Sequence, residues 1–180
     1  MRVLVLVFLF MLSPFVHAGE CTDLIQWAQT LRPGVSAPMI EFACHQAVEH
    51  RLPPRVVVSV MFVESSFRPI IHSDTSYGVM QINTKVHPKL IAMMQRRYHL
   101  WWIYNWRLNI AIGTALLARL VSESPNMATA LQRYNGTFAN WHYSWRVLYL
   151  SQQFGRWQAH AHPIATLLQR LNRQGAGLML

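Results

Sequence analysis

Apolar residues recur at helical spacing along most of this chain, and Pro and Gly residues divide it into segments of helical length. Between residues 37 and 50 the apolar side chains fall three or four positions apart, with polar residues between them. Pro54 opens a second such segment, since proline suits the first helical position, where a backbone N–H would lack an intrahelical acceptor. The pattern predicts a mainly α-helical fold.

Further segments extend this prediction toward the C-terminus. Apolar stripes favour helices over 110–120 and 142–154. Ser124 followed by Pro125 is typical of a capping hydroxyl before a first helical turn, and Gly136 ends that segment. Beyond Pro163 we expect a short helix and then a loose tail over 171–180.

Signals for β-strands are scarce. The valines at 56–58 favour a strand by propensity alone, but the length of their segment favours a helix. The stretch from Tyr77 to Asn83 is the one plausible extended piece. We therefore expect at most a short β-hairpin or extended segment beside the helices.

The first eighteen residues have the organisation of a signal peptide. Arg2 precedes an apolar run from Val3 to Leu12, and Val16 and Ala18 place small residues before a cleavage point after Ala18. The run is about half of the roughly 20 apolar residues that a membrane-spanning helix needs. We expect an exported, periplasmic or secreted protein without a membrane span, and a single domain over 19–180.

The chain is strongly basic, and the excess is carried mainly by arginine. Loss of Arg2 with the signal lowers the formal net charge from +9 to +8, and the only lysines are Lys85 and Lys89. Such a charge favours an anionic partner such as nucleic acid, acidic phospholipid or bacterial wall polymer. The arginines are spread along the chain instead of forming one patch, which argues against a nucleic-acid-binding module.

The two cysteines predict a disulfide bond. Cys21 and Cys44 both lie early in an exported chain, where the compartment is oxidising. The alternatives are two free thiols or a nucleophilic Cys44 activated by His45, although neighbours in sequence usually point apart. The pattern His-Glu-x-x-His is missing, and His160 and His162 have no acidic or cysteine neighbours, so no metal site is predicted.

Glu64 is the first candidate for chemistry. It follows Val57, Val60 and Met61 at helical spacing, which places a carboxyl group on an apolar stripe. Burial raises the pKa of a carboxyl group and so fits it to donate a proton near neutral pH. The alternative is a solvated glutamate, or one that pairs with Arg68.

Four motifs in order resemble the lysozyme-like domain of soluble lytic transglycosylases. They are the run from Glu64 to Pro69 followed by Ser73, the segment Gly78 to Asn83, Asn109-Ile110 with Gly113, and Ala130-Leu131 with Tyr134-Asn135. The resemblance spans roughly residues 50–150. It differs from the family pattern in a slightly shorter loop before Gly78 and in Tyr77, where a small residue is usual.

The resemblance implies a helical lysozyme-like fold that cleaves the β-1,4 bond between N-acetylmuramic acid and N-acetylglucosamine in peptidoglycan. Glu64 would be the single catalytic acid and base, and Ser73 would bind sugar. The remaining expected substrate-site residues are Gly78, Met80 and Gln81 along the glycan cleft, Tyr134, whose hydroxyl would orient the catalytic carboxyl, and Asn135, which would support that corner.

The scarcity of acids bears on the mechanism. Ordinary glycosidases place two carboxyl groups about 5–9 Å apart, and only Asp74 lies near Glu64 in the motif block. If Asp74 faces solvent, Glu64 acts alone and the product is a 1,6-anhydro sugar, formed by a lyase without a cofactor. The alternatives are a hydrolytic muramidase with Asp74 as base, and a basic nucleic-acid- or wall-binding module without catalysis.

The expected partners follow from this reading. We expect a monomer that binds glycan strands of peptidoglycan and no nucleic acid. A secretion, conjugation or pilus apparatus is a further partner that a small exported wall-cutting enzyme would suit. We also expect a core or helix-packing role for most of the aromatic cluster at Trp101, Trp102, Tyr104 and Trp106, with one or two of these rings reaching the cleft.

Overall fold

Helices make up most of the computed structural model, which describes residues 13–136 and 141–161, with side chains from residue 19 onward. The mainly α-helical prediction is confirmed. The helices are α2 (Ser13–Leu31), α3 (Ala37–Glu49), α4 (Pro54–Ser65), α5 (Pro88–Tyr98), α6 (Trp106–Ser122), α7 (Met127–Tyr134) and α8 (Trp141–Ala161). The strands are β1 (His72–Ser73), β2 (Ser76–Tyr77) and β3 (Ile82–Asn83).

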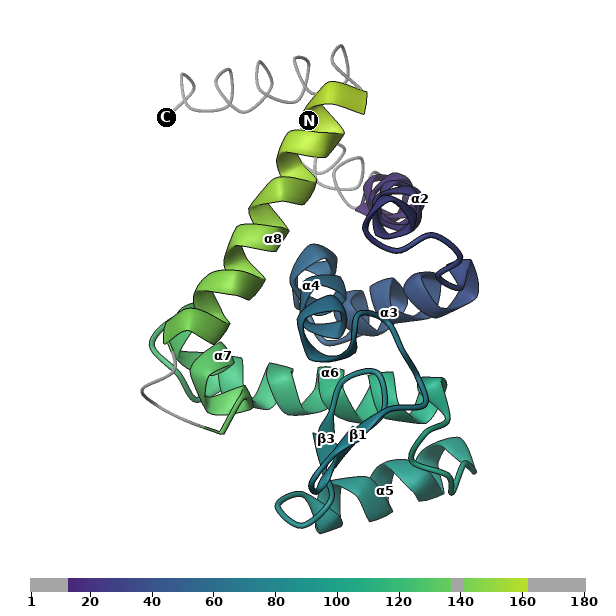
Figure 1. The fold of residues 1–180 in the computed structure, drawn as a ribbon, viewed down its shortest axis with the longest axis vertical. Helices are drawn as coiled ribbons and strands as arrows, with labels where there is room; N and C mark the ends of the chain where they lie inside the picture. The colour runs from purple at the N-terminus through teal and green to yellow at the C-terminus, as the bar shows by residue number, and fades with distance from the viewer. Residues whose placement is uncertain (1–12, 137–140, 162–180) are drawn as a thin grey trace, which may run out of the picture.

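The helices surround α4, which carries the candidate acid. Helix α4 packs against α3 and α8, and α8 runs along one side of the molecule to close over both α4 and α7 (Figure 1). Helix α6 packs against α3, α5 and α7 and contacts β3, and the small sheet and α5 are drawn at the same end of the molecule (Figure 1). The end of α4, the sheet and α7 are thereby brought together.

The valine-rich start of α4 is helical because the helix is buried on nearly all sides. Val56, Val57, Val58 and Val60 are each no more than 4% exposed. A helix surrounded by other helices needs apolar residues around most of its circumference, and not along one stripe only. Burial of the β-branched side chains therefore outweighs their preference for strands.

The sheet contains three two-residue strands in the order β1-β2-β3, all antiparallel. Its two rows of paired residues are Ser73, Ser76 and Asn83 on one side, and His72, Tyr77 and Ile82 on the other. The segment from Tyr77 to Asn83, expected as one extended piece, instead contains the last residue of β2, a turn and the whole of β3. Successive residues face opposite sides of a strand, so one row can face a ligand while the other packs elsewhere.

Two predicted helix boundaries can be compared with the structure. The helix predicted over 37–50 is confirmed by α3. The start predicted at Ser124 and Pro125 is wrong, because Asn126 caps α7 with its Oδ1 accepting from Thr129 N at 2.9 Å. The Ser124 hydroxyl instead lies 3.1 Å from Nη1 of Arg133. The expected helix and tail beyond Pro163 lie outside the described residues.

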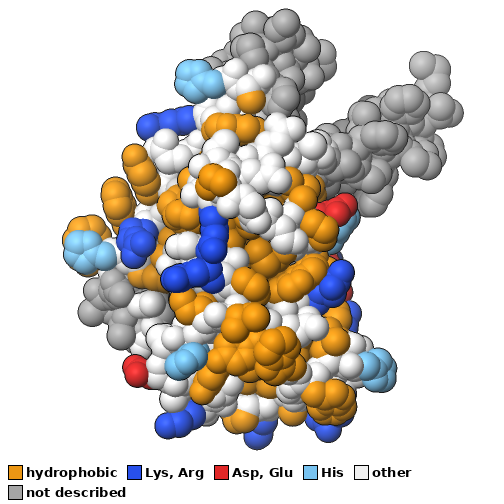
Figure 2. Space-filling view, turned by 45° about the vertical axis from the view of Figure 1, so that its right-hand side comes forward, with side chains coloured by type: hydrophobic (Ala, Val, Ile, Leu, Met, Phe, Trp, Pro, Cys, Tyr) orange, Lys and Arg blue, Asp and Glu red, His pale blue; other side chains and the backbone are white. Residues whose placement is uncertain are grey.

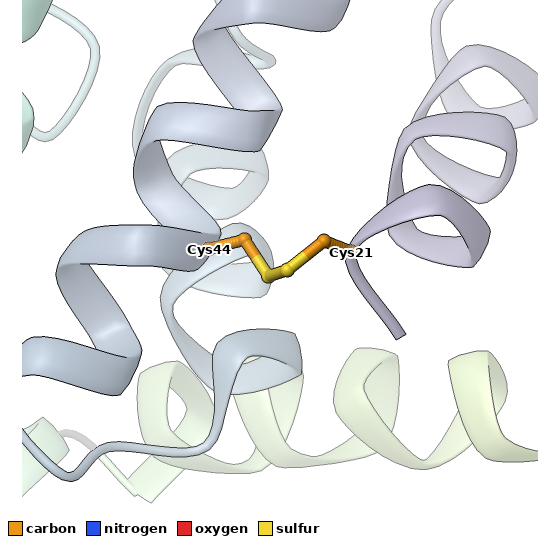
Figure 3. The surroundings of a disulfide bond; sticks show 2 residues. All are labelled: Cys21 and Cys44. Carbon is orange, nitrogen blue, oxygen red and sulfur yellow. A yellow bond between two sulfur atoms is a disulfide. The ribbon is translucent and has the colours of Figure 1, made fainter. Parts of the chain in front are cut away.

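The predicted disulfide is present between α2 and α3. Cys21 and Cys44 are bonded, with their Cα atoms 5.8 Å apart, and both are buried (Figure 3). The alternatives of free thiols and a nucleophilic Cys44 are thereby excluded. Among the residues that the structure describes, no helix is long and apolar enough to cross a membrane.

Candidate active site

A cavity of about 260 Å³ opens where the end of α4 meets the small sheet and α7. It brings together Glu64 from α4, Ser73 and Gln81 from the sheet region, and Tyr134 and Asn135 from the end of α7. The other lining residues are Ser76, Asn83, Val86, His87, Leu116, Arg133 and Gly136. Five of the residues expected from the sequence at a substrate site therefore share one cavity.

Glu64 lies in the last turn of α4, beside the apolar residues that precede it in its stripe. Burial is the largest influence on this carboxyl group and raises its pKa to about 7. A hydrogen bond from Tyr143 and the positive charge of Arg146 act in the opposite direction and lower the pKa. The carboxyl group is therefore present in both protonated and ionised forms near neutral pH, as a group that gives and then takes a proton must be.

Tyr143 is the direct partner of the candidate acid. This tyrosine lies in the first turn of α8, is buried, and donates its hydroxyl hydrogen to Oε1 of Glu64 at 2.5 Å. Burial, and then the neighbouring Glu64, raise the pKa of Tyr143 well above its usual value, so the hydroxyl stays a donor. The contact links residues that are 79 positions apart in the chain.

The contact with the acid was expected from Tyr134, and this expectation is wrong, because Tyr143 makes it. The Tyr134 hydroxyl donates to the backbone carbonyl of Met80 at 2.9 Å. Tyr134 still lines the cavity, and burial, followed by the charge of Glu64, raises the pKa of its hydroxyl. Tyr134 therefore holds the segment from Gly78 to Asn83 through the Met80 carbonyl, whereas Tyr143 orients the carboxyl group of Glu64.

Glu64 is the only acidic side chain that lines the cavity. All seven aspartates and glutamates of the chain lie within the described residues, so this comparison is complete. Asp74 is exposed in the turn between β1 and β2 and does not line the cavity. The alternative ion pair between Glu64 and Arg68 does not form. The Nε of Arg68 donates instead to the Ser65 carbonyl.

The sheet and the turn before β3 supply a polar wall of the cavity. Ser73 donates from Oγ to Oε1 of Gln81 at 2.8 Å, and both residues line the cavity. Gln81 also donates from Nε2 to the carbonyl of Gly78 at 2.9 Å. The hydroxyl and amide groups are held in place by one another, with oxygen lone pairs remaining for donors on a ligand.

Gly78 and Met80 lie beneath this wall instead of lining the cavity. A Cβ on Gly78, whose φ is +80°, would come within 2.3 Å of the Asn109 side chain. The side chain of Met80 is fully buried, and a Cβ on Gly113 would lie 2.5 Å from its sulfur. Gly78 and Met80 therefore do not make the contacts expected along the glycan cleft. They pack instead against α6, which holds the segment from Gly78 to Asn83 in place.

Asn109 is the residue that fixes the segment to α6. Its Oδ1 accepts from Met80 N at 2.8 Å, and its Nδ2 donates to the carbonyls of Tyr77 at 2.8 Å and Ile103 at 3.1 Å. The side chain is fully buried and uses three of its hydrogen-bonding positions. A buried amide with this many partners fixes the distance between the sheet and the helices.

Three residues at the candidate site were not expected from the sequence. Tyr143 lies outside the four motifs that resemble the family. Only its position in the apolar pattern of the helix that starts at residue 141 could have indicated that it is buried. His87 lines the cavity and precedes Pro88, a signal for the start of α5. Burial, and then the charge of Arg119, lower the pKa of His87, so its imidazole is neutral at neutral pH. Arg133 also lines the cavity and pairs with Glu123 at 2.9 Å.

The expected packing of most of the aromatic cluster is met by only two of its four residues, Tyr104 and Trp106. Trp101 and Trp102 are 68% and 59% exposed, and neither lines the cavity. Trp106 does pack inward, with its ring 5.7 Å from that of Phe42. Tyr77 belongs to the row of the sheet that faces away from the cavity and contacts the Tyr104 ring at 5.6 Å.

The donor set of the cavity suits proton transfer better than metal binding. One carboxyl group, one imidazole, and several hydroxyl and amide groups surround the space. In the described part of the chain no group of three or more His, Cys, Asp or Glu side chains is placed to hold a metal ion. The arrangement can therefore donate and accept a proton beside a neutral polar ligand.

Comparison with known families identifies this arrangement. No curated protein matches the chain. The family described as Transglycosylase SLT domain matches residues 42–145, which is more than half of the chain and includes Glu64, the sheet, Tyr134 and Tyr143. The chain therefore belongs to the SLT transglycosylase family, whose enzymes act on peptidoglycan outside the cytoplasm.

Proposed function

We propose that the protein is a lytic transglycosylase that cleaves the bond between N-acetylmuramic acid and N-acetylglucosamine and leaves a 1,6-anhydromuramic acid end. The observation that carries the proposal is the solitary carboxyl group in the cavity, with its pKa near 7 and a tyrosine donor on it. A hydrolase of the ordinary type needs a second carboxyl group across the scissile bond. The cavity supplies none.

The reaction begins with protonated Glu64. It donates its proton to the glycosidic oxygen, and the bond from that oxygen to C1 of the muramic acid breaks. The 2-acetamido carbonyl of the same sugar stabilises the positive charge that develops at C1. Ser73, Gln81 and Asn135 line the cavity, and their hydroxyl and amide groups would hold the hydroxyl and acetamido groups of the glycan.

The second step uses Glu64 as a base. The ionised carboxylate removes the proton from the 6-hydroxyl, and O6 forms the new bond to C1, so the proton first given is recovered and no water is consumed. Tyr143 supports this form, because its hydrogen bond and the charge of Arg146 both favour the carboxylate. The residue that orients the acid thus also stabilises the base.

The proposal includes the place where the enzyme works. A disulfide between Cys21 and Cys44 suggests an exported protein. We propose that residues 1–18 are the signal peptide, with cleavage after Ala18. The mature protein would be a monomer that acts in local remodelling of the cell wall. Opening the wall for a secretion, conjugation or pilus apparatus is one form that such remodelling takes.

The decisive experiment is product analysis. The purified protein is incubated with peptidoglycan sacculi, and the released muropeptides are separated and weighed by mass spectrometry. We expect anhydro ends, which are lighter than reducing ends by one water. Reducing muramic acid ends would contradict the proposal and favour a hydrolytic muramidase, and Asp74→Asn would then be tested as the variant that lacks the base.

A further inference from the structure

A second hollow lies away from the catalytic cavity, between α8 and the starts of α4 and α7. It has a volume of about 730 Å³, which is large enough for several side chains of a partner. Apolar groups come from all three helices, with Val56, Met127 and Leu148 among them. Arg55 of α4 and Arg156 of α8 also line the hollow.

A row of exposed aromatic residues continues this hollow along α8. Trp141, Trp145 and Tyr149 are 58%, 54% and 44% exposed, and they follow one another at intervals of four residues. The Trp145 and Tyr149 rings stack with their centroids 5.0 Å apart. Trp145 precedes Leu148 by three positions, so the row and the hollow share one face of the helix. We call the row and the hollow together the α8 surface.

The α8 surface is positively charged and lacks acidic groups. Arg55, Arg156 and His160 line the hollow, and none of the chain's seven acidic side chains does. Neither arginine forms an ion pair among the described residues. On the face drawn in Figure 2, basic and hydrophobic side chains likewise share the surface and acidic ones are sparse.

We propose that the α8 surface docks an acidic segment of another protein, which places apolar side chains in the hollow and carboxylates against Arg55 and Arg156. Exposed tryptophan, tyrosine, methionine and arginine are the residues enriched where protein interfaces gain most of their binding energy. The surface lies on the side of α8 opposite Tyr143, so a bound segment leaves the catalytic cavity open.

Three other occupants fit less well. Residues 162–180 of this chain carry Arg170 and Arg173 and no acidic side chain, so they do not complement the charge. An anionic bilayer would present a broad, even surface to the aromatic row, whereas a concave hollow of this volume suits protruding side chains of a peptide better. Short acidic peptides of the wall lack large apolar side chains to fill it.

Selection from a random peptide library tests the proposal without knowledge of the natural partner. Twelve-residue peptides displayed on phage are selected on the purified protein, and binders are resynthesised with a fluorescent label for anisotropy. We expect the enriched peptides to combine at least two Asp or Glu residues with a large apolar residue.

The variants separate this site from general attraction between opposite charges. Arg55→Glu with Arg156→Glu reverses two charges in the hollow, whereas Lys89→Glu with Arg96→Glu makes the same change of charge on exposed positions of α5. We expect the first pair to raise the Kd at least tenfold and the second less than twofold. Trp145→Ala should also weaken binding, and all three variants should cleave peptidoglycan at the rate of the parent protein, which verifies their fold.

Several results would overturn the proposal. They are a library that yields no acidic binders, equal weakening by the two double variants, and displacement of the peptides by soluble muropeptides. Stronger binding to phosphatidylglycerol vesicles than to any peptide, lost in Trp145→Ala, would assign the surface to a membrane instead. Because cleavage is measured separately, failure of the docking proposal leaves the proposed catalytic function standing.

Discussion

The two walls of the catalytic cavity are built on opposite principles. The helical wall is Glu64 of α4, which lines the cavity, together with Tyr143 of α8, which is buried outside the lining and donates a hydrogen bond of 2.5 Å to the acid. The sheet wall is formed by strands of two residues with exposed hydroxyl and amide groups. Burial shifts the pKa of an acid, whereas accessible hydroxyl and amide groups suit hydrogen bonding to a ligand, so under the proposed function the two walls separate chemistry from recognition.

The strongest test of this separation is Glu64→Gln. The amide keeps the shape of the side chain but cannot transfer a proton, so we expect kcat to fall by a factor of about 10²–10⁴ while KM changes little. Release of soluble muropeptides from sacculi measures the effect. Asp74→Asn is the matched control and should keep the parental rate, while a comparable loss in that control would show that the chemistry is shared between the walls.

The same substitution carries a prediction for stability. The pKa of Glu64 is raised from 4.5 to about 7 in the folded protein, so the carboxyl group favours folding below pH 4.5 and progressively loses that contribution as pH rises to 7. Glu64→Gln removes the loss. We expect the variant to be more stable than the parent by roughly 1–2 kcal/mol at pH 8, with a smaller gain at pH 5. Thermal unfolding followed by circular dichroism at the two pH values would show it.

A glycine substitution tests how the sheet wall is attached. Gly78→Ala forces a Cβ into the Asn109 side chain, in addition to the cost of a positive φ, so we expect a loss of about 2–4 kcal/mol of folding free energy. Gly34 has the same φ of +80° but nothing within 4 Å of an added Cβ. Gly34→Ala should therefore cost only about 1 kcal/mol in urea unfolding. Equal costs would mean that the contact with Asn109 does not fix the sheet.

Tyr143→Phe weakens the helical wall without removing the acid. The variant loses a hydrogen bond to a charged group, for which we expect a decrease of about 10- to 100-fold in kcat. This bond lowers the pKa of Glu64, so the fall of kcat/KM above pH 7 should move to higher pH in the variant. Tyr134→Phe is the comparison and should leave the position of that fall unchanged. An unshifted profile in Tyr143→Phe would reduce this tyrosine to a packing residue.

The smallest effect is expected on the polar wall. Ser73→Ala removes one hydroxyl and its bond to Gln81, and we expect KM to rise by about twofold to fivefold with kcat nearly unchanged. Steady-state assays on soluble glycan chains would separate the two constants. A fall in kcat as large as that of Tyr143→Phe would place Ser73 in the chemistry and end the division between the walls.

The sequence contained more information about the helical wall than about the contacts across it. The position of Glu64 on an apolar stripe follows from spacing within one helix, and burial of that stripe accounts for the raised pKa. The tyrosine that touches the acid could not be chosen in this way, because Tyr134 and Tyr143 belong to different helices and only their packing decides which hydroxyl reaches Glu64.

The sheet wall was the less predictable part for a different reason. Its strands are two residues long, too short for an alternating pattern to appear. Its shape depends on Asn109, a buried amide on another helix that bonds to three backbone groups. The cap of α7 was also misassigned, since Ser124 and Asn126 are both good capping residues and the side chain of Arg133 contacts the former.

The hydrogen bond between Tyr143 and Glu64 has a consequence for timing. Its two residues are 79 positions apart, and the later one lies in the last described helix. A nascent chain that ends before this helix carries the glutamate but not the group that orients it. Glu64 therefore gains its orienting donor only once α8 has been made and has packed against α4.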